Sequence, residues 1–197
     1  MTFIKTIGEA EATGAVAEFY AQDRENTGYV WNLSRMFSPR PEVYGAWKQL
    51  IAAIRDNMDR RRYELATLAA ARHLRSSYCM LQHSSVLLDM FMSAEELEAV
   101  AADHHDAGLE PVDVAVMDFA EKVAVDATSI TQEDVDGLRA HGLTDADVLD
   151  VVLAAAARSF LCKAMDGVGT QPDPQSGAAI PPGLREALVI GRPISPR

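Results

Sequence analysis

Apolar residues along this chain recur mostly three and four positions apart, the spacing that lines one face of an α-helix. The pattern predicts helices over residues 9–22, 41–56, 111–125, 131–140 and 144–169, with two more around Glu64 and Cys79 and a short one after Ser93. Segments that alternate between apolar and polar residues, as half-buried strands do, are few and unconvincing. We therefore predict an all-α protein.

Residues that favour helix ends agree with this periodicity. Pro41 suits the first position of its helix, because its missing N–H needs no partner there and its φ angle is already helical. Ser93 and Glu96 form a capping box, and Gly142 after His141 is a typical glycine stop.

The last part of the chain, residues 171–197, is rich in proline and glycine. Such a segment cannot form a hydrophobic core of its own. We therefore expect one helical domain over residues 1–170, followed by a C-terminal arm over residues 171–197. The arm is expected to pack on the surface of the domain or on a neighbouring molecule.

Three chemically active side chains lie near one another in the sequence: Glu64, Cys79 and His83. Ser76 is a good N-cap for the helix that carries the last two, because its hydroxyl can accept a hydrogen bond from the first turn. Cys79 then occupies the third helical position, where the helix dipole and the free N–H groups lower the pKa of a thiol. His83 follows four residues later on the same face. Tyr78 is expected to edge this site as a packed aromatic residue.

Each of these residues also has a structural interpretation. A lone cysteine or histidine is often a core residue. Cys79 and His83 point to a function only in combination with Glu64. The three could serve as metal ligands, but a fourth ligand is not evident, so we expect neither a metal nor a cofactor. Cys162 lies on an apolar helix face and is expected in the core. Pairing it with Cys79 would need Cα atoms within about 7 Å, which sequence does not reveal. Trp31 and Trp47 are expected to fill the core or an interface.

Composition narrows the functional classes. The chain has 197 residues, of which 48% are hydrophobic, enough for one globular domain with a sizeable core. A formal net charge of −11 argues against binding to nucleic acid or to an anionic membrane, both of which select basic patches. Two distant cysteines suit a reducing compartment, and neither a secretory signal nor an apolar run of membrane-spanning length is evident. We expect a soluble, cytoplasmic protein.

The sequence also hints at an internal duplication. Glu64 precedes Cys79 by the same interval as Asp147 precedes Cys162, and both intervals contain an Ala-Ala-Arg run, although in different registers. We therefore expect two similar helix pairs with approximate internal symmetry.

Together, Glu64, Ser76, Tyr78, Cys79 and His83 resemble the motif of the carboxymuconolactone decarboxylase/AhpD-like superfamily, in particular its branch of single-domain peroxidase-related proteins. The family pattern is a glutamate followed, twelve residues later, by Cys-x-x-Cys-x-x-x-His. The likeness extends over roughly residues 10–170, far beyond the motif. It implies an AhpD-like helical domain with approximate internal duplication.

The resemblance implies thiol-dependent reduction of a small hydroperoxide. In AhpD-like enzymes the second cysteine attacks the peroxide, the first resolves the sulfenic acid as a disulfide, and the glutamate and histidine transfer protons. These roles make Cys79 the peroxidatic thiol and make His83 and Glu64 the proton-transfer residues. Ser76 stands where the family has its first cysteine and cannot form that disulfide. We expect Ser76 instead to cap the helix and donate a hydrogen bond to Cys79.

The reductant then has to come from outside: a small thiol, a dihydrolipoyl group or another protein. The family usually forms trimers or hexamers, so the resemblance also implies a homo-oligomer, with the C-terminal arm as a clasp.

Two other functions stay open. Glu64 and His83 could serve an acid–base enzyme, such as a decarboxylase or isomerase acting on a small carbonyl compound, although the decarboxylases of the superfamily generally lack this cysteine. The chain could also be a non-catalytic helical oligomer that has lost its Cys-x-x-Cys chemistry. Fold resemblance alone does not choose among these functions.

Overall fold

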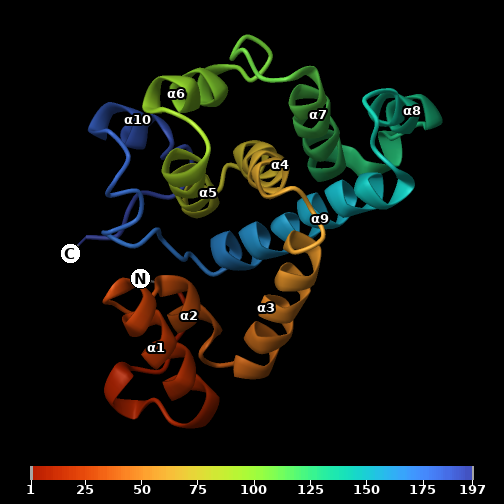
Figure 1. Ribbon diagram of the computed structural model, residues 1–197. Coiled ribbons are helices and arrows are strands. Elements are labelled where there is room, and N and C mark those ends of the chain that lie inside the picture. Colours follow the sequence, from red (N-terminus) through yellow and green to blue (C-terminus); the bar gives the residue numbers. More distant parts are fainter. Residues whose placement is uncertain (1, 197) are drawn as a thin grey trace.

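The computed structural model describes residues 2–196, and within that range it contains helices and no strand (Figure 1). In chain order the elements are η1 (Glu9–Glu11), α1 (Gly14–Thr27), α2 (Asn32–Phe37), α3 (Pro41–Arg55), α4 (Arg60–His73), α5 (Ser77–Met90), α6 (Ala94–Ala102), α7 (Pro111–Asp126), η2 (Ala127–Ser129), α8 (Gln132–Ala140), α9 (Asp145–Gly167) and α10 (Pro182–Ala187). The prediction of an all-α protein is confirmed.

Local sequence signals set most helix boundaries. Pro41 opens α3, and capping boxes at Ser93, Thr131 and Thr144 open α6, α8 and α9. In each box the hydroxyl accepts a backbone N–H of the first turn, and an acidic side chain accepts the N–H of the capping residue in return. These helices therefore begin where the sequence predicted.

The N-terminal region differs from the sequence-based expectation. The single helix predicted over residues 9–22 is divided into η1 and α1, because the backbone is extended at Ala12 and Thr13. Helix α1 then runs on to Thr27 and ends at Gly28, whose positive φ of 84° suits glycine. Helix α2 follows directly after the connection and was not predicted.

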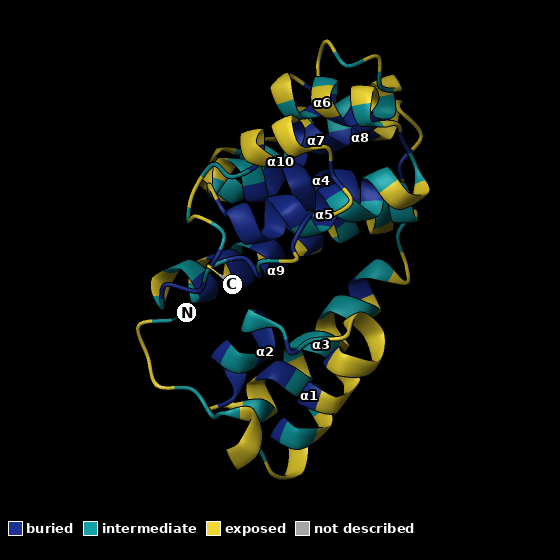
Figure 2. Ribbon diagram, turned by 90° about the vertical axis from the view of Figure 1, so that its left-hand side faces the viewer, coloured by how far each residue is buried: buried dark blue, intermediate teal, exposed yellow. Residues whose placement is uncertain are grey.

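Helix α4 lies at the centre of the molecule and contacts α5, α7 and α9 (Figures 1 and 2). Residues 63–71 of this helix are all buried, and four of them are alanines. Small side chains allow neighbouring helices to approach closely, and a helix buried on every side belongs in a core. Helix α4 thus holds Glu64 in the most enclosed part of the fold.

Helices α1, α2 and α3 form an N-terminal lobe beside this main body (Figure 2). Aromatic rings hold the lobe together: Phe37 stacks on Tyr44 with centroids 4.9 Å apart, and Phe19 meets Tyr44 edge-on at 5.0 Å. Helix α3 also packs against α9. This contact joins the lobe to the main body on the side where the candidate site opens.

The C-terminal segment, residues 171–196, returns to the main body of its own chain (Figure 1). Ile180, Leu184 and Leu188 belong to the same buried cluster as Leu81 and Leu87 of α5. The segment thus covers part of the core near the helix that carries Cys79. Over residues 2–196, no helix combines the length and the apolar character that crossing a membrane requires.

Candidate functional site

Cys79 is the third residue of α5 and Ser76 precedes the first, as the sequence predicted. The predicted role of the Ser76 hydroxyl is wrong, however. Among the described residues it neither caps the first turn nor donates a hydrogen bond to Cys79. Ser76 is fully buried against α9, and its hydroxyl lies beside the Cys162 thiol and the Asp166 carboxyl.

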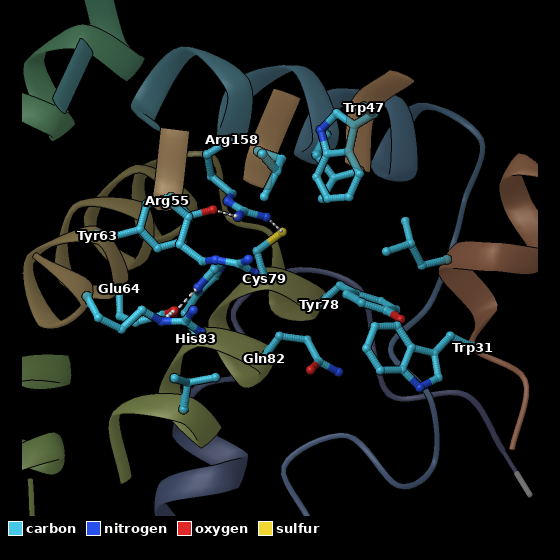
Figure 3. A pocket seen from close by; sticks show the side chains of 15 residues that line it. Trp31, Trp47, Arg55, Tyr63, Glu64, Tyr78, Cys79, Gln82, His83 and Arg158 are labelled. Carbon is cyan, nitrogen blue, oxygen red and sulfur yellow. Dashed lines mark hydrogen bonds and ion pairs between the residues drawn. The ribbon is translucent and has the colours of Figure 1, made fainter. Parts of the chain in front are cut away.

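The Cys79 sulfur is enclosed by two groups from α9, of which Figure 3 shows Arg158. Cys162 Sγ lies 3.3 Å from Cys79 Sγ and donates a hydrogen bond to it, and Arg158 Nη1 donates to the same sulfur over 3.6 Å. The hydrogen bond from Cys162 lowers the pKa of Cys79, burial raises it, and the charge of Arg158 lowers it further. The balance leaves the pKa of Cys79 well below that of an ordinary cysteine.

At this contact the Cys162 thiol is the hydrogen-bond donor and the Cys79 sulfur is the acceptor. Hydrogen bonding to the Cys79 thiolate raises the pKa of Cys162, and burial raises it further. Cys162 therefore keeps its proton and acts as the donor. The expectation that Cys162 lies in the core is confirmed, since only 1% of its surface is exposed. Its position against Cys79 was not predicted.

Arg158 is a functional candidate that the sequence analysis missed. Its side chain is only 4% exposed, and Nη2 donates to the Tyr63 hydroxyl over 3.4 Å while Nη1 faces Cys79. A buried cation without a partner is strongly unfavourable, so a thiolate beside it is favoured in turn. The signal was available in the sequence: Arg158 is a single charge inside the apolar run of α9, three and four residues before Leu161 and Cys162.

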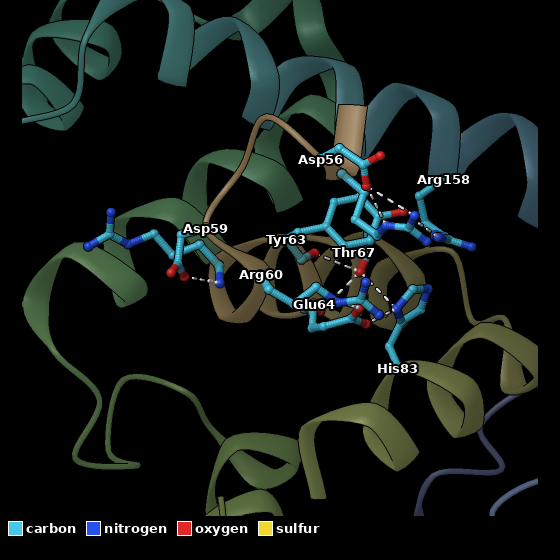
Figure 4. A network of polar contacts seen from close by, with 10 residues as sticks. Asp56, Asp59, Arg60, Tyr63, Glu64, Thr67, His83 and Arg158 are labelled. Carbon is cyan, nitrogen blue, oxygen red and sulfur yellow. Dashed lines mark hydrogen bonds and ion pairs between the residues drawn. The ribbon is translucent and has the colours of Figure 1, made fainter. Parts of the chain in front are cut away.

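Glu64 and His83 meet across the α4–α5 pair, as predicted. Glu64 Oε2 lies 2.5 Å from His83 Nδ1, and the Thr67 hydroxyl lies 3.0 Å from the same nitrogen (Figure 4). The carboxylate thus holds Nδ1, which leaves Nε2 as the nitrogen available for proton transfer. Both side chains are buried, with 1% of Glu64 and 8% of His83 exposed.

Glu64 stays ionised despite this burial. Burial raises its pKa, but the nearby His83 ring and Arg60 guanidinium lower it by more, so the pKa of Glu64 lies below its ordinary value. Arg60 Nε is 2.7 Å from Glu64 Oε1, an i,i+4 ion pair on α4. The carboxylate is therefore held between a cation and the imidazole.

A pocket of about 170 Å³ opens onto both groups (Figure 3). Glu64, Cys79 and His83 line one side, and apolar and aromatic side chains from the N-terminal lobe line the other. Those side chains are Trp31, Leu33, Trp47 and Ile51. Trp31 and Trp47 thus line the pocket. The sequence analysis expected them to fill the core or an interface and did not place them at this site.

Tyr78 also lines the pocket, as predicted, and it connects the site to the C-terminal segment. Its hydroxyl donates to Asp173 Oδ2 over 2.8 Å, and Asp173 Oδ1 accepts the backbone N–H of Asn32 at 2.8 Å. Burial raises the pKa of Tyr78 well above its ordinary value, and the Asp173 carboxylate adds to this. Tyr78 is thus a neutral hydrogen-bond donor that ties α5, α2 and the C-terminal segment together.

Metal-ligating groups are found together at another place in the fold. Ligand atoms of Asp103, His104 and His105 lie within 4.8 Å of one another, in the connection after α6. At the candidate site, by contrast, Glu64 and His83 engage each other.

The site thus combines a buried cysteine of lowered pKa with a glutamate–histidine pair inside an all-α domain. Residues 41–122, a stretch that includes Glu64, Cys79 and His83, match the sequence profile of the carboxymuconolactone decarboxylase family. A comparison with curated proteins gave no significant match.

Solved structures extend the likeness to nearly the whole chain. A peroxidase-related protein from Ralstonia eutropha JMP134, described as an alkylhydroperoxidase AhpD core, is 20% identical over 89% of this chain and 94% of its own, with a TM-score of 0.81. A peroxidase-related protein from Silicibacter sp. TM1040 is 15% identical over 89% and 91%, with a TM-score of 0.76. The debrominase Bmp8 in complex with 2,3,4-tribromopyrrole is 14% identical over 94% and 95%, with a TM-score of 0.71. The chain therefore has the AhpD-like fold.

Proposed function

We propose that this protein is a thiol-dependent reductase of small organic hydroperoxides, with Cys79 as the attacking thiolate. One observation carries the proposal: the Cys79 sulfur accepts hydrogen bonds from Arg158 and Cys162, in the same pocket as the Glu64–His83 pair. A thiolate is the reactive form of cysteine, so a site that lowers the pKa of Cys79 favours attack on an electrophile. The structural neighbours described as peroxidase-related point to the same chemistry.

The residues supply each part of the reaction. The Cys79 sulfur attacks the terminal peroxide oxygen, the O–O bond breaks, and Cys79 becomes a sulfenic acid. The departing alkoxide takes a proton from His83 Nε2 and leaves as an alcohol. Glu64, bonded to Nδ1, orients the ring and leaves Nε2 as the nitrogen that gives up the proton.

The pocket favours a small, apolar substrate. Its volume of about 170 Å³ is close to that of an apolar cavity able to hold a benzene-sized molecule, about 150 Å³. Two tryptophans and two aliphatic side chains from the N-terminal lobe form its far wall. We expect an alkyl hydroperoxide such as tert-butyl hydroperoxide to react faster than hydrogen peroxide.

The electrons that reduce the enzyme come from an external thiol, either a small molecule or a dihydrolipoyl group. The protein acts as a homo-oligomer.

The proposal is tested by peroxide turnover with dihydrolipoamide as reductant. Cys79→Ser abolishes turnover, because a serine hydroxyl is neither acidic nor nucleophilic enough to attack a peroxide. Ser85→Ala, a change on the same helix away from the pocket, serves as the matched control and retains activity. Full turnover in the Cys79→Ser variant would rule out the proposal.

The pH dependence of Cys79 alkylation gives a second test, followed by mass spectrometry. Because the pKa of Cys79 is lowered, the thiolate persists as the pH falls below the ordinary cysteine value of about 8.5. The alkylation rate is therefore expected to stay high at neutral pH and to drop only as the pH falls through the lowered pKa. A rate that rises only near pH 8.5 or above would show an ordinary thiol and count against the proposal.

The Glu64–His83 pair supports acid–base catalysis on a small carbonyl compound as a second candidate. The pair is assembled through its own 2.5 Å contact, which does not involve Cys79. Turnover of such a compound that survives Cys79→Ala but is lost in His83→Gln would favour this function over peroxide reduction.

A further inference from the structure

We propose that Cys162 takes over the role of the cysteine that Ser76 replaces, so that Cys79 and Cys162 close into a reversible disulfide across α5 and α9. The proposal rests on the proposed function for its oxidant, a small hydroperoxide. With this disulfide, no external thiol is needed to resolve the sulfenic acid. The external reductant then only has to reduce the disulfide.

The distance between the sulfur atoms supports this pairing. Cys79 Sγ and Cys162 Sγ are 3.3 Å apart, whereas a disulfide bond is about 2.05 Å long. The two atoms therefore have to approach by about 1.2 Å for the bond to form. Both cysteines are free thiols, and the chain has two cysteines in total, so each has the other as its available partner within one molecule.

Cys162 also lies beside the residue it replaces. The Ser76 hydroxyl is next to the Cys162 thiol, and Ser76 is fully buried at the position where the family carries its first cysteine. The second sulfur of the site thus comes from the facing surface of α9 and not from the start of α5. The chain keeps two sulfurs at the site while departing from the Cys-x-x-Cys pattern.

The reaction balances in two steps. In the first, Cys79 gains an S–O bond as the O–O bond of the hydroperoxide breaks, which oxidises the sulfur by two electrons and releases an alcohol. In the second, Cys162 sulfur forms an S–S bond with Cys79 as the S–O bond breaks, and the proton of the Cys162 thiol leaves with the hydroxyl group as water. An external dithiol then reduces the disulfide and becomes a disulfide itself.

The surroundings of Cys162 order these steps. In the reduced protein the hydrogen bond to the Cys79 thiolate is the main cause that raises the pKa of Cys162, so Cys162 does not compete for the peroxide. Once Cys79 is a neutral sulfenic acid, that cause is gone. Arg158 and Ser76, which both lower the pKa of Cys162, remain in place. Burial still raises the pKa of Cys162, but the largest cause of the rise is gone, so Cys162 is a better nucleophile after Cys79 has been oxidised than before.

Access to the disulfide runs through the pocket. Cys79 lines the pocket, so an incoming thiol attacks the Cys79 sulfur and releases Cys162 as the leaving group. A mixed disulfide then remains on Cys79, and a second thiol on the same reductant removes it intramolecularly. The arrangement thus favours a dithiol of the dihydrolipoyl class over a monothiol.

The pairing is tested first with diamide, which oxidises thiols without a peroxidase reaction. Folded wild-type protein is treated with diamide, remaining thiols are alkylated, and peptides are mapped without reduction. A peptide pair joined through Cys79 and Cys162, in a monomer lighter by two hydrogen atoms, is the expected result. Two alkylated thiols after oxidation would overturn the proposal.

The same mapping after one equivalent of tert-butyl hydroperoxide separates the pairing from the proposed function. A Cys79–Cys162 linkage after treatment with each oxidant supports both the pairing and the proposed function. Linkage by diamide while the peroxide leaves both thiols reduced supports the pair and defeats the peroxidase function. Cys79 oxidised to sulfenic or sulfinic acid with Cys162 still a free thiol overturns the pair and leaves the function standing.

Two variants sharpen this test. Cys162→Ala is expected to lose the linkage, and dimedone then traps the Cys79 sulfenic acid that the wild type consumes. Adding Ser76→Cys to Cys162→Ala restores the Cys-x-x-Cys pattern of the family and is expected to restore a peroxide-dependent linkage, now between positions 76 and 79. Recovery shows that the loss came from the missing sulfur and not from misfolding. A wild type that accumulates as much dimedone adduct as Cys162→Ala would overturn the resolving role.

Discussion

At Cys79, two electrostatic effects of opposite sign compete. Taking a charge out of water costs several kcal/mol even in a relaxed protein site, which disfavours the thiolate. The Cys162 hydrogen bond and the Arg158 guanidinium outweigh that cost, and the pKa of Cys79 falls. Arg158 gains equally from the contact: burial lowers its pKa, but the Cys79 thiolate and Tyr63 raise it by more. Each charge is thus stable because the other is buried beside it.

Removing this guanidinium is expected to raise the pKa of Cys79. The Arg158 guanidinium lowers the pKa of Cys79, so Arg158→Met is expected to raise that pKa toward the ordinary cysteine value. The alkylation rate at neutral pH and the peroxidase rate fall together as a result. Arg158→Lys keeps a positive charge on the same helix and is the matched control, with a smaller shift. An unchanged pH profile in Arg158→Met would show that the Cys162 contact alone activates Cys79.

The start of α5, the element that carries Cys79, is held in place by the C-terminal segment. The backbone N–H of Gly191 donates to Ser77 Oγ over 2.8 Å, and Arg75 Nη2 donates to the carbonyl of Ile190 over 3.0 Å. Arg75 itself adopts a positive φ of 55°, a conformation that non-glycine residues rarely take. The chain therefore turns into α5 through a strained residue that contacts from the C-terminal segment stabilise.

Position 191 has to be glycine, because the backbones at Gly191 and Arg75 approach closely at this contact. A Cβ atom at Gly191 would overlap the carbonyl oxygen of Arg75, which cannot rotate away as a side chain can. Gly191→Ala is therefore expected to lower the free energy of unfolding by about 1–3 kcal/mol, measured by urea denaturation. It should also slow the Cys79 reaction by displacing the start of α5. Gly183→Ala is the control, because a Cβ there meets no atom of the described chain within 4 Å. Equal stability of the two variants would contradict this account.

At the scale of the whole molecule, one face of α9 is apolar and exposed to solvent. Leu149, Leu153 and Phe160 are 55%, 37% and 49% exposed, and their spacing of four and seven residues places them on the same side of the helix. The opposite side of α9 carries Arg158 and Cys162 into the site. A second copy of the chain that covered the apolar face would therefore pack directly behind the candidate site, which supports the proposed homo-oligomer.

Charges on this face are expected to dissociate the oligomer. The double change Leu153→Glu and Phe160→Glu should reduce the mass measured by light scattering to that of one chain, because burying two carboxylates in an apolar interface is strongly unfavourable. Met90→Glu, an equally exposed apolar position at the end of α5, is the control and should leave the mass unchanged. A wild type that is already a monomer would overturn the proposed homo-oligomer.

The sequence by itself predicted most of the helices and four residues of the candidate site, Glu64, Tyr78, Cys79 and His83. Capping boxes and Pro41 act within a single turn, so their effect is visible without any tertiary contact. Glu64, Cys79 and His83 also lie within one pair of consecutive helices, and such neighbours along the chain usually become neighbours in space. The fold class and this part of the site therefore followed from local pattern and from motif.

Only the tertiary structure decided what surrounds the Cys79 sulfur. Arg158 and Cys162 follow Cys79 by 79 and 83 residues, and they reach it because the inner face of α9 packs against the central helices. Trp31 and Trp47 reach the pocket through the packing of a separate lobe. The Ser76 hydroxyl failed as a cap because burial against α9 placed it beside Cys162 and Asp166. Periodicity specifies which face of a helix is buried, but it does not specify which distant helix that face meets.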